Sequence, residues 1–158
     1  WARDPIYNNT VSIFPWTDSR SLSEVLLDAR DIKIVMYKII LELNRTVSKG
    51  FFHMDIKPLN IIVDSVYEDG DYVTKKSNIL IIDWNLVNFY YEGAMFDFRR
   101  GTSCYQAPEL MIWSKYYTPN VDVWSLGVSM YYIITGKKPL KNCSKDALAG
   151  LIKFVGYK

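Results

Sequence analysis

The chain has 158 residues, of which 49% are apolar, so it can bury the core of an ordinary domain and its composition argues against disorder. Its 19 basic and 17 acidic residues leave a formal charge of +2, which argues neither for nor against a polyanionic partner. The longest apolar runs are far too short to span a bilayer. The two cysteines, Cys104 and Cys143, are too few for a disulfide framework and indicate a reducing compartment.

The first predicted elements are a strand and two helices. The β-branched and aromatic residues of 10–14 predict the strand, which Pro15 ends. Residues 21–29 predict a short helix because Ser21 and Glu24 have the spacing of a capping box. A longer helix is expected to begin after Asp31 and to end at Gly50, since its apolar residues recur at helical spacing at Ile32, Val35, Met36, Ile39, Ile40, Leu43 and Val47.

The middle of the chain predicts a small β-hairpin. Its strands are 61–63 and 79–82, and the polar segment between them carries a turn signal at Asp69-Gly70. Residues 84–107 have no clear period and predict an extended loop. Polar residues therefore gather before the first strand and after the second.

Two helices are predicted in the last part of the chain. The first covers 121–135, with Asn120 as its cap and Gly136 at its end, and its apolar residues on nearly every side predict that it is fully buried. The second covers 144–156. The predicted fold is mainly α with a small β-hairpin.

Three polar motifs follow one another along the chain. The first is H-x-D-x-K-P-x-N at 53–60, the second is Asp83-Trp84-Asn85, and the third is GTSCYQAPE at 101–109. Asp122 follows within VDVWSLG. Each motif alone has an ordinary explanation, such as a solvated turn or a strand-end cap, and their joint occurrence in this order outweighs those explanations.

The motifs resemble those of a eukaryotic protein kinase, in its C-terminal lobe only. Trp84, where most kinases have Phe, resembles the alpha subunit of casein kinase 2, as do flanking segments along the chain. The resemblance implies a protein-kinase-like fold in which 1–20 form a hinge-region strand and linker and 21–158 form the C-lobe, incomplete at its C-terminal end. No glycine-rich loop or strand lysine precedes Trp1, so the N-lobe is expected to be absent.

The resemblance also implies ATP and Mg²⁺ as cofactors and a role for each motif residue. Asp55 would accept the proton of the attacking hydroxyl or orient that hydroxyl, and Lys57 would balance the charge of the γ-phosphate. Asn60 and Asp83 would hold Mg²⁺ through oxygen atoms. Thr102 would bond Asp55 and Lys57 and shape the floor beneath the substrate hydroxyl. Lys57 is typical of kinases that act on serine and threonine.

Further residues and partners are expected from the same resemblance. Phe14 would lie behind the adenine, and Thr17 would offer backbone groups to the adenine edge. Arg99 and Arg100 could contact the acidic side chains of a protein substrate. A regulatory subunit is implied, neither nucleic acid nor membrane is an expected partner, and the expected location is cytoplasmic or nuclear.

Two residues depart from the family pattern. Met54 replaces the arginine that usually contacts a charged group of the activation loop, which argues against activation through the usual ion pair. Asn85 replaces the glycine of the metal-binding triplet, where asparagine tolerates left-handed backbone angles. The leading hypothesis is an acid-directed Ser/Thr kinase. The alternatives are a binding module without turnover and a helical scaffold unrelated to kinases.

Overall fold

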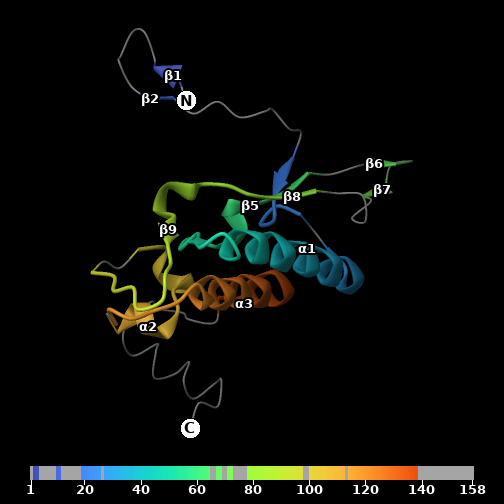
Figure 1. Ribbon diagram of the computed structural model, residues 1–158. Coiled ribbons are helices and arrows are strands. Elements are labelled where there is room, and N and C mark those ends of the chain that lie inside the picture. Colours follow the sequence, from blue (N-terminus) through green and yellow to red (C-terminus); the bar gives the residue numbers. More distant parts are fainter. Residues whose placement is uncertain are drawn as a thin grey trace.

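The computed structural model describes residues 2–3, 10–11, 19–25, 27–64, 67–68, 71–72, 78–97, 100–112 and 114–138. Two long helices lie side by side in this part of the chain, α1 (Ala29–Val47) and α3 (Asn120–Thr135) (Figure 1). A small three-stranded sheet lies against α1, on the side away from α3. The predicted fold, mainly helical with a small β-hairpin, is therefore observed in the described residues.

Helix α1 begins with a capped N-terminus. The carboxylate of Asp28 accepts hydrogen bonds from the backbone N–H groups of Arg30 (2.8 Å) and Asp31 (2.7 Å). The predicted cap, Asp31, is wrong, since this residue lies inside the first turn. The predicted buried stripe is confirmed at Val35, Ile39 and Leu43, which are spaced four apart, whereas Ile40 and Val47 are exposed.

The predicted hairpin is confirmed, and its first strand is the central strand of the sheet. Strand β5 (Ile61–Asp64) pairs antiparallel with β8 (Asn78–Ile81), and Ile61 lies opposite Ile81. On its other edge β5 pairs antiparallel with β3 (Arg20–Ser21), which gives the strand order β3-β5-β8. Two short paired strands, β6 (Tyr67–Glu68) and β7 (Asp71–Tyr72), flank the predicted Asp69-Gly70 turn.

The helix predicted over 21–29 is wrong, because of its described residues only Ala29 is helical, and that residue begins α1. Ser21 belongs to β3, and the backbone N–H of Leu22 donates to the carbonyl of Ile61 at 2.8 Å. The N–H of Glu24 donates to the carbonyl of Ser21, so the supposed capping box is a turn. Leu22 is fully buried, and its burial in the core outweighs the local helix signal.

Two hydrophobic clusters form the core of the described residues. The first cluster joins α1, the sheet and α3, and contains Leu22, Val35, Ile39, Leu43, Ile56, Ile61, Val63, Ile79, Leu126 and Met130. The second cluster lies beneath the 53–60 loop and contains Phe52, Met54, Ala94, Phe96, Ala107, Leu110, Tyr117 and Val121. Helix α3 contributes to both clusters and so connects the two halves of the core.

Helix α3 ends as predicted but is less buried than predicted. Gly136 has the left-handed angles (φ 66°) that commonly end a helix. Pro119 occupies the N-cap position, so Asn120 is the first helical residue and the predicted cap is wrong. Val123 is 60% exposed and Ile134 is 59% exposed, which contradicts the prediction of a fully buried helix.

The remaining elements are short. The segment 84–107 is mostly irregular, as predicted, but includes two 3₁₀ turns, η2 (Trp84–Leu86) and η3 (Ser103–Tyr105). The other short elements are β1 (Ala2–Arg3) paired with β2 (Thr10–Val11), β4 (Phe51–Phe52) paired with β9 (Asn88–Phe89), η1 (Pro58–Asn60) and α2 (Pro108–Met111). Most of the predicted strand 10–14 and all of the predicted helix 144–156 lie outside the described residues.

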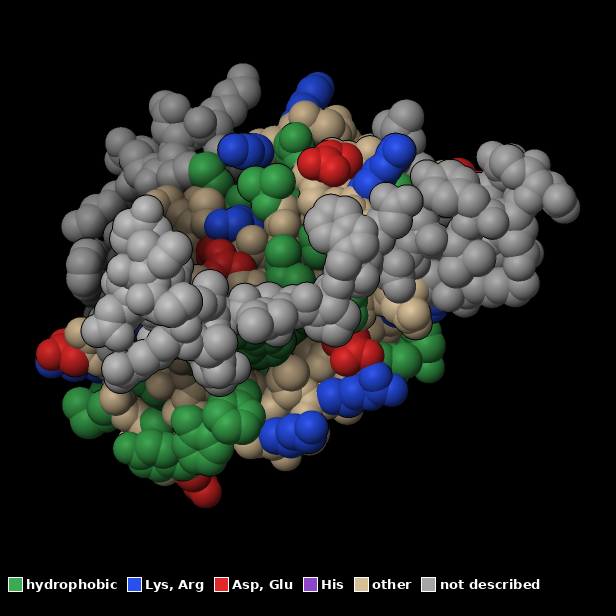
Figure 2. Space-filling view, turned by 90° about the horizontal axis from the view of Figure 1, so that it is seen from above, with side chains coloured by type: hydrophobic (Ala, Val, Ile, Leu, Met, Phe, Trp, Pro, Cys, Tyr) green, Lys and Arg blue, Asp and Glu red, His purple; other side chains and the backbone are tan. Residues whose placement is uncertain are grey.

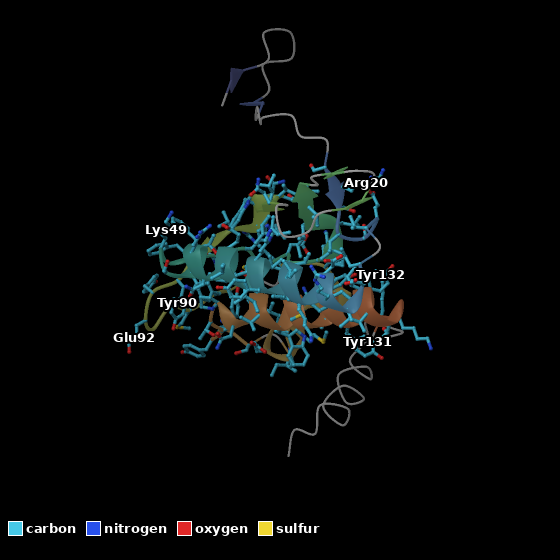
Figure 3. The ribbon with its side chains drawn as sticks, turned by 90° about the vertical axis from the view of Figure 1, so that its right-hand side faces the viewer. Arg20, Lys49, Tyr90, Glu92, Tyr131 and Tyr132 are labelled. Carbon is cyan, nitrogen blue, oxygen red and sulfur yellow. The ribbon has the colours of Figure 1, made fainter. Side chains whose placement is uncertain are left out.

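The surface of the described part is mixed in character. Seen from above, acidic and basic side chains lie beside one another among hydrophobic ones (Figure 2). Tyr90 and Glu92 lie at the opposite end of the molecule from Tyr131 and Tyr132 on α3 (Figure 3). Within the described ranges, the structure contains no helix with the length and apolarity needed to cross a membrane.

Candidate active site

Asp122 anchors the 53–60 loop to helix α3. Its carboxylate accepts hydrogen bonds from the backbone N–H groups of His53 (2.6 Å) and Met54 (2.8 Å), and the residue is 1% exposed. Burial raises the pKa of Asp122 to about 6, although the two backbone hydrogen bonds act in the opposite direction. Asp122 therefore supports the conformation of the loop.

His53 connects the loop to the end of strand β8. Its Nδ1 atom accepts a hydrogen bond from the backbone N–H of Asp55 (3.2 Å), so Nε2 carries the proton and donates to the carbonyl of Ile82 (2.9 Å). The ring also meets the ring of Trp84 edge-on, with centroids 4.6 Å apart. Burial lowers the pKa of His53, which favours this neutral form.

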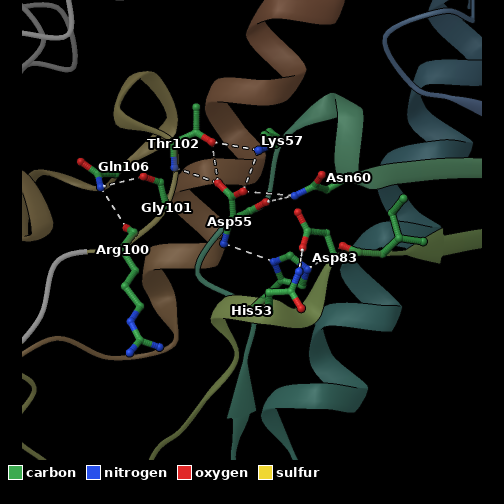
Figure 4. Close-up of polar contacts among 11 residues, drawn as sticks. His53, Asp55, Lys57, Asn60, Asp83, Arg100, Gly101, Thr102 and Gln106 are labelled. Carbon is green, nitrogen blue, oxygen red and sulfur yellow. Dashed lines mark hydrogen bonds and ion pairs between the residues drawn. The ribbon is translucent and has the colours of Figure 1, made fainter. Parts of the chain in front are cut away.

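Asp55 is the centre of the polar network (Figure 4). Its Oδ2 atom accepts from Lys57 Nζ at 2.7 Å and from Asn60 Nδ2 at 3.2 Å. Its Oδ1 atom accepts from both the backbone N–H (2.8 Å) and the hydroxyl (2.7 Å) of Thr102. Lys57 Nζ also donates to the Thr102 hydroxyl at 3.0 Å, so these three side chains form a closed triangle.

The network sets the protonation state of Asp55. Burial of this residue raises its pKa, but the hydrogen bonds from Lys57 and Thr102 more than offset that effect and hold the pKa below its usual value. Asp55 is therefore ionised at neutral pH and is an acceptor of hydrogen bonds only. A carboxylate of this kind can orient a neighbouring hydroxyl group or accept its proton.

A close backbone contact holds Thr102 against the loop. Gly101 has φ 95°, and a Cβ atom added there would lie 2.3 Å from the carbonyl oxygen of Met54. Gln106 supports the same segment, since its Nε2 donates to the carbonyls of Arg100 (2.9 Å) and Gly101 (3.2 Å). Gly101 and Gln106 were not predicted from the sequence as site residues. The positive φ of a glycine cannot be read from the sequence.

Asn60 and Asp83 are brought together by the pairing of their strands. The backbone N–H of Ile82 donates to the carbonyl of Asn60 at 3.0 Å, which places Asp83 next to Asn60 at one end of the sheet. Asn60 uses its Nδ2 group to donate to the carbonyl and the carboxylate of Asp55, which leaves its amide oxygen for another partner. Asp83 is exposed and has left-handed backbone angles (φ 63°, ψ 59°).

This donor set fits a divalent cation that prefers oxygen. One carboxylate and one amide oxygen match Mg²⁺, which is usually bound by one or two protein groups together with waters and phosphates. The part of the chain that the structure describes contains no group of three or more His, Cys, Asp or Glu residues that could hold a metal ion. A site built mainly from the protein, as structural zinc requires, is thus not found there.

Some expectations lie outside the described residues or are wrong. Phe14, Thr17 and Arg99 are not described, whereas Arg100 is exposed and directly precedes Gly101. Left-handed backbone angles were expected at Asn85. Among the described residues other than glycine, they occur instead at Met54 (φ 70°) and Asp83 (φ 63°). Cys104 takes part in a disulfide bond, and the expected compartment stays a prediction.

Comparisons with known proteins point to one family. Residues 8–154 match the family described as Protein kinase domain. A probable serine/threonine-protein kinase of Dictyostelium discoideum is 30% identical to the chain over 148 residues, which are 91% of the chain and 23% of that relative. The chain thus spans about a quarter of the length of this curated relative. Because the family match covers most of the chain, the chain belongs to the protein kinase family.

Proposed function

We propose that the protein is a serine/threonine kinase that transfers the γ-phosphate of ATP to a hydroxyl group of a protein. One observation carries this proposal: the ionised carboxylate of Asp55 is held by Lys57 and Thr102, next to the oxygen ligands of Asn60 and Asp83. Phosphoryl transfer depends mainly on positioning and on charge compensation, and this arrangement can supply both. The described residues would then supply the C-lobe share of the site.

The residues of the chain would divide the work as follows. Asp55 orients the substrate hydroxyl and accepts its proton as the new bond to phosphorus forms. Lys57 places its positive charge beside the negative charge that builds up on the transferred group. Thr102 fixes the carboxylate of Asp55 through two hydrogen bonds, so that the acceptor atoms do not have to reorganise.

Asn60 and Asp83 would hold Mg²⁺ through their side-chain oxygens. When bound, the ion would neutralise the charge of the nucleotide phosphates. Asp83 is exposed and available for this purpose, whereas Asn60 is fixed by its hydrogen bonds to Asp55. The same asparagine therefore connects the cation site to the proton acceptor.

The finer parts of the proposal concern specificity. The resemblance to casein kinase 2 alpha favours an acid-directed enzyme, with Arg99 and Arg100 as contacts to acidic substrate side chains and with a regulatory subunit. Phe14 and Thr17 would contact the adenine of ATP. We propose a cytoplasmic or nuclear location. The basic pair supports the substrate preference because it directly precedes the segment that contacts Asp55.

An activity measurement tests the proposal. In the full-length protein that contains this chain, Asp55→Asn should lower phosphate transfer from ATP·Mg²⁺ to an acidic serine peptide by about 100-fold or more, as expected for the loss of a proton acceptor. Asp31→Asn, a matched change in the first turn of α1, should leave activity unchanged. Equal activity of Asp55→Asn and the wild type would contradict the proposal.

A binding module without turnover is the second candidate. Met54 and Asn85 favour it, since both depart from the pattern of active kinases. The complete set of Asp55, Lys57, Asn60 and Asp83 favours the enzyme. Detectable transfer by the full-length protein, lost in Asp55→Asn, would exclude the second candidate.

A further inference from the structure

The side chain of Asn85 forms a contact with the candidate metal ligand. Its Nδ2 group donates a hydrogen bond of 2.7 Å to Oδ1 of Asp83. Asp83 precedes the 3₁₀ turn η2, and Asn85 is the second residue of that turn. Both side chains are exposed, so the bond lies in solvent rather than in the core.

An exposed carboxylate needs help to stay in one orientation. Without a partner, the Asp83 side chain would exchange among several rotamers, and cation binding would have to select one of them. A hydrogen bond from a neutral amide to a carboxylate favours one rotamer without adding a charge that competes for the cation. The bond engages one lone pair of Oδ1 and leaves Oδ2 for a ligand.

We infer that Asn85 is a positioning residue that holds the carboxylate of Asp83 in the orientation that binds a divalent cation. This inference rests on the proposed role of Asp83 as a metal ligand. A glycine at position 85 has no side chain and could not form the bond, so the substitution seen in this chain supplies an interaction to the site. Groups that orient the ligands of a metal often contribute substantially to its affinity.

The geometry also defines the opposite outcome. If the amide competed with the cation for Oδ1, removal of Asn85 would tighten cation binding. If the amide orients the carboxylate, its removal weakens binding. The sign of the change in affinity therefore separates the two effects.

The test is a titration of the purified full-length protein with Mn²⁺ in place of Mg²⁺, followed by electron paramagnetic resonance of the free ion. Asn85→Ala should weaken Mn²⁺ binding by roughly 3- to 10-fold, because an oriented but exposed hydrogen bond to a charged ligand is lost. Asn44→Ala, a matched change on the exposed side of α1, should leave the affinity unchanged. The thermal unfolding temperature of both variants should match the wild type, since a purely structural role would lower it.

Asp83→Ala separates failure of this inference from failure of the proposed function. Loss of Mn²⁺ binding in Asp83→Ala, together with weaker binding in Asn85→Ala, supports the inference. Loss in Asp83→Ala with unchanged or tighter binding in Asn85→Ala overturns the inference alone. Unchanged binding in Asp83→Ala, or no Mn²⁺ binding by the wild type, overturns both the metal role of Asp83 and the inference.

Discussion

At the scale of single residues, Asp122 fixes the backbone of the loop that carries the site. It is almost completely buried. Both backbone N–H groups that donate hydrogen bonds to its carboxylate belong to the loop that contains Asp55. The left-handed backbone of Met54 turns the chain so that both N–H groups point at one carboxylate. The conformation of the loop and the hydrogen bonding of the Asp122 carboxylate therefore depend on each other.

Replacing Asp122 should destabilise the protein. Asp122→Ala leaves two buried N–H groups without an acceptor, at a cost of about 2–5 kcal/mol in the free energy of unfolding. Chemical denaturation measures this loss. Asp97→Ala serves as the matched control, because the side chain of Asp97 is exposed and its replacement should change stability by less than about 0.5 kcal/mol. A loss no larger than that of the control would contradict the assigned role.

The stability that Asp122 contributes should also depend on pH. The pKa of Asp122 is raised from 3.8 to about 6 on folding, so the folded state binds the proton more tightly than the unfolded state. The stabilisation from protonation is complete below about pH 4 and is lost as the pH rises through about 6. The difference in unfolding free energy between wild type and Asp122→Ala should therefore grow as the pH falls from 7 to 4. A constant or shrinking difference would show that the pKa is not raised.

At the scale of elements, the sequence predicted long periodic segments better than short ones. Helix α1 was found because its apolar residues repeat with the helical period, and the β5–β8 hairpin was found because two apolar runs flank a polar segment with a turn signal. Residues 21–29 were mispredicted because a capping box is a local signal, whereas Leu22 is drawn into the first cluster by a backbone bond to Ile61. Such a contact between distant residues leaves no periodic mark in the sequence.

The N-terminus of α1 allows a direct comparison of the predicted and the observed cap. Asp28→Ala removes both capping hydrogen bonds and should cost about 1 kcal/mol in unfolding free energy. Asp31→Ala removes only a favourable charge near the helix end and should cost about 0.5 kcal/mol or less. Urea denaturation of the two variants measures both values. A larger loss for Asp31→Ala would restore the cap predicted from the sequence.

At the scale of the whole molecule, the second cluster fastens the segment around Phe96 beneath the 53–60 loop. Phe52 meets Phe96 edge-on, with centroids 5.6 Å apart, and Phe96 stacks on Tyr117 at 4.6 Å. Met54 is 3% exposed within this cluster. Apolar side chains thus surround Met54, the position at which the family pattern has an arginine that forms an ion pair.

Met54→Arg should therefore damage the fold rather than restore a regulatory contact. A guanidinium group buried among these apolar side chains should cost about 3 kcal/mol or more in unfolding free energy. Met54→Leu, which conserves volume, should cost less than about 1.5 kcal/mol. Chemical denaturation, together with hydrogen exchange of residues 94–96, checks both effects. An arginine variant as stable as the wild type would contradict the packing argument.

Motif order allowed the family to be predicted from the sequence, and the family match confirms the protein kinase assignment. The residues of the Asp55 triangle were also predicted, because each belongs to a motif with a fixed spacing. The supporting residues were not. Gly101 acts through its positive φ and its close approach to the Met54 carbonyl, and Asn85 and Gln106 act through local side-chain hydrogen bonds. Residue identity alone does not encode these contacts.

The lack of a side chain at Gly101 limits how this protein can diverge. Even one methyl group there would collide with the Met54 carbonyl and push the peptide of Thr102 off the loop. Gly127, by contrast, has nothing within 4 Å of an added Cβ atom, although it lies within helix α3. Two glycines in one chain thus face opposite evolutionary constraints, and only the first is tied by sterics to the chemistry of the site.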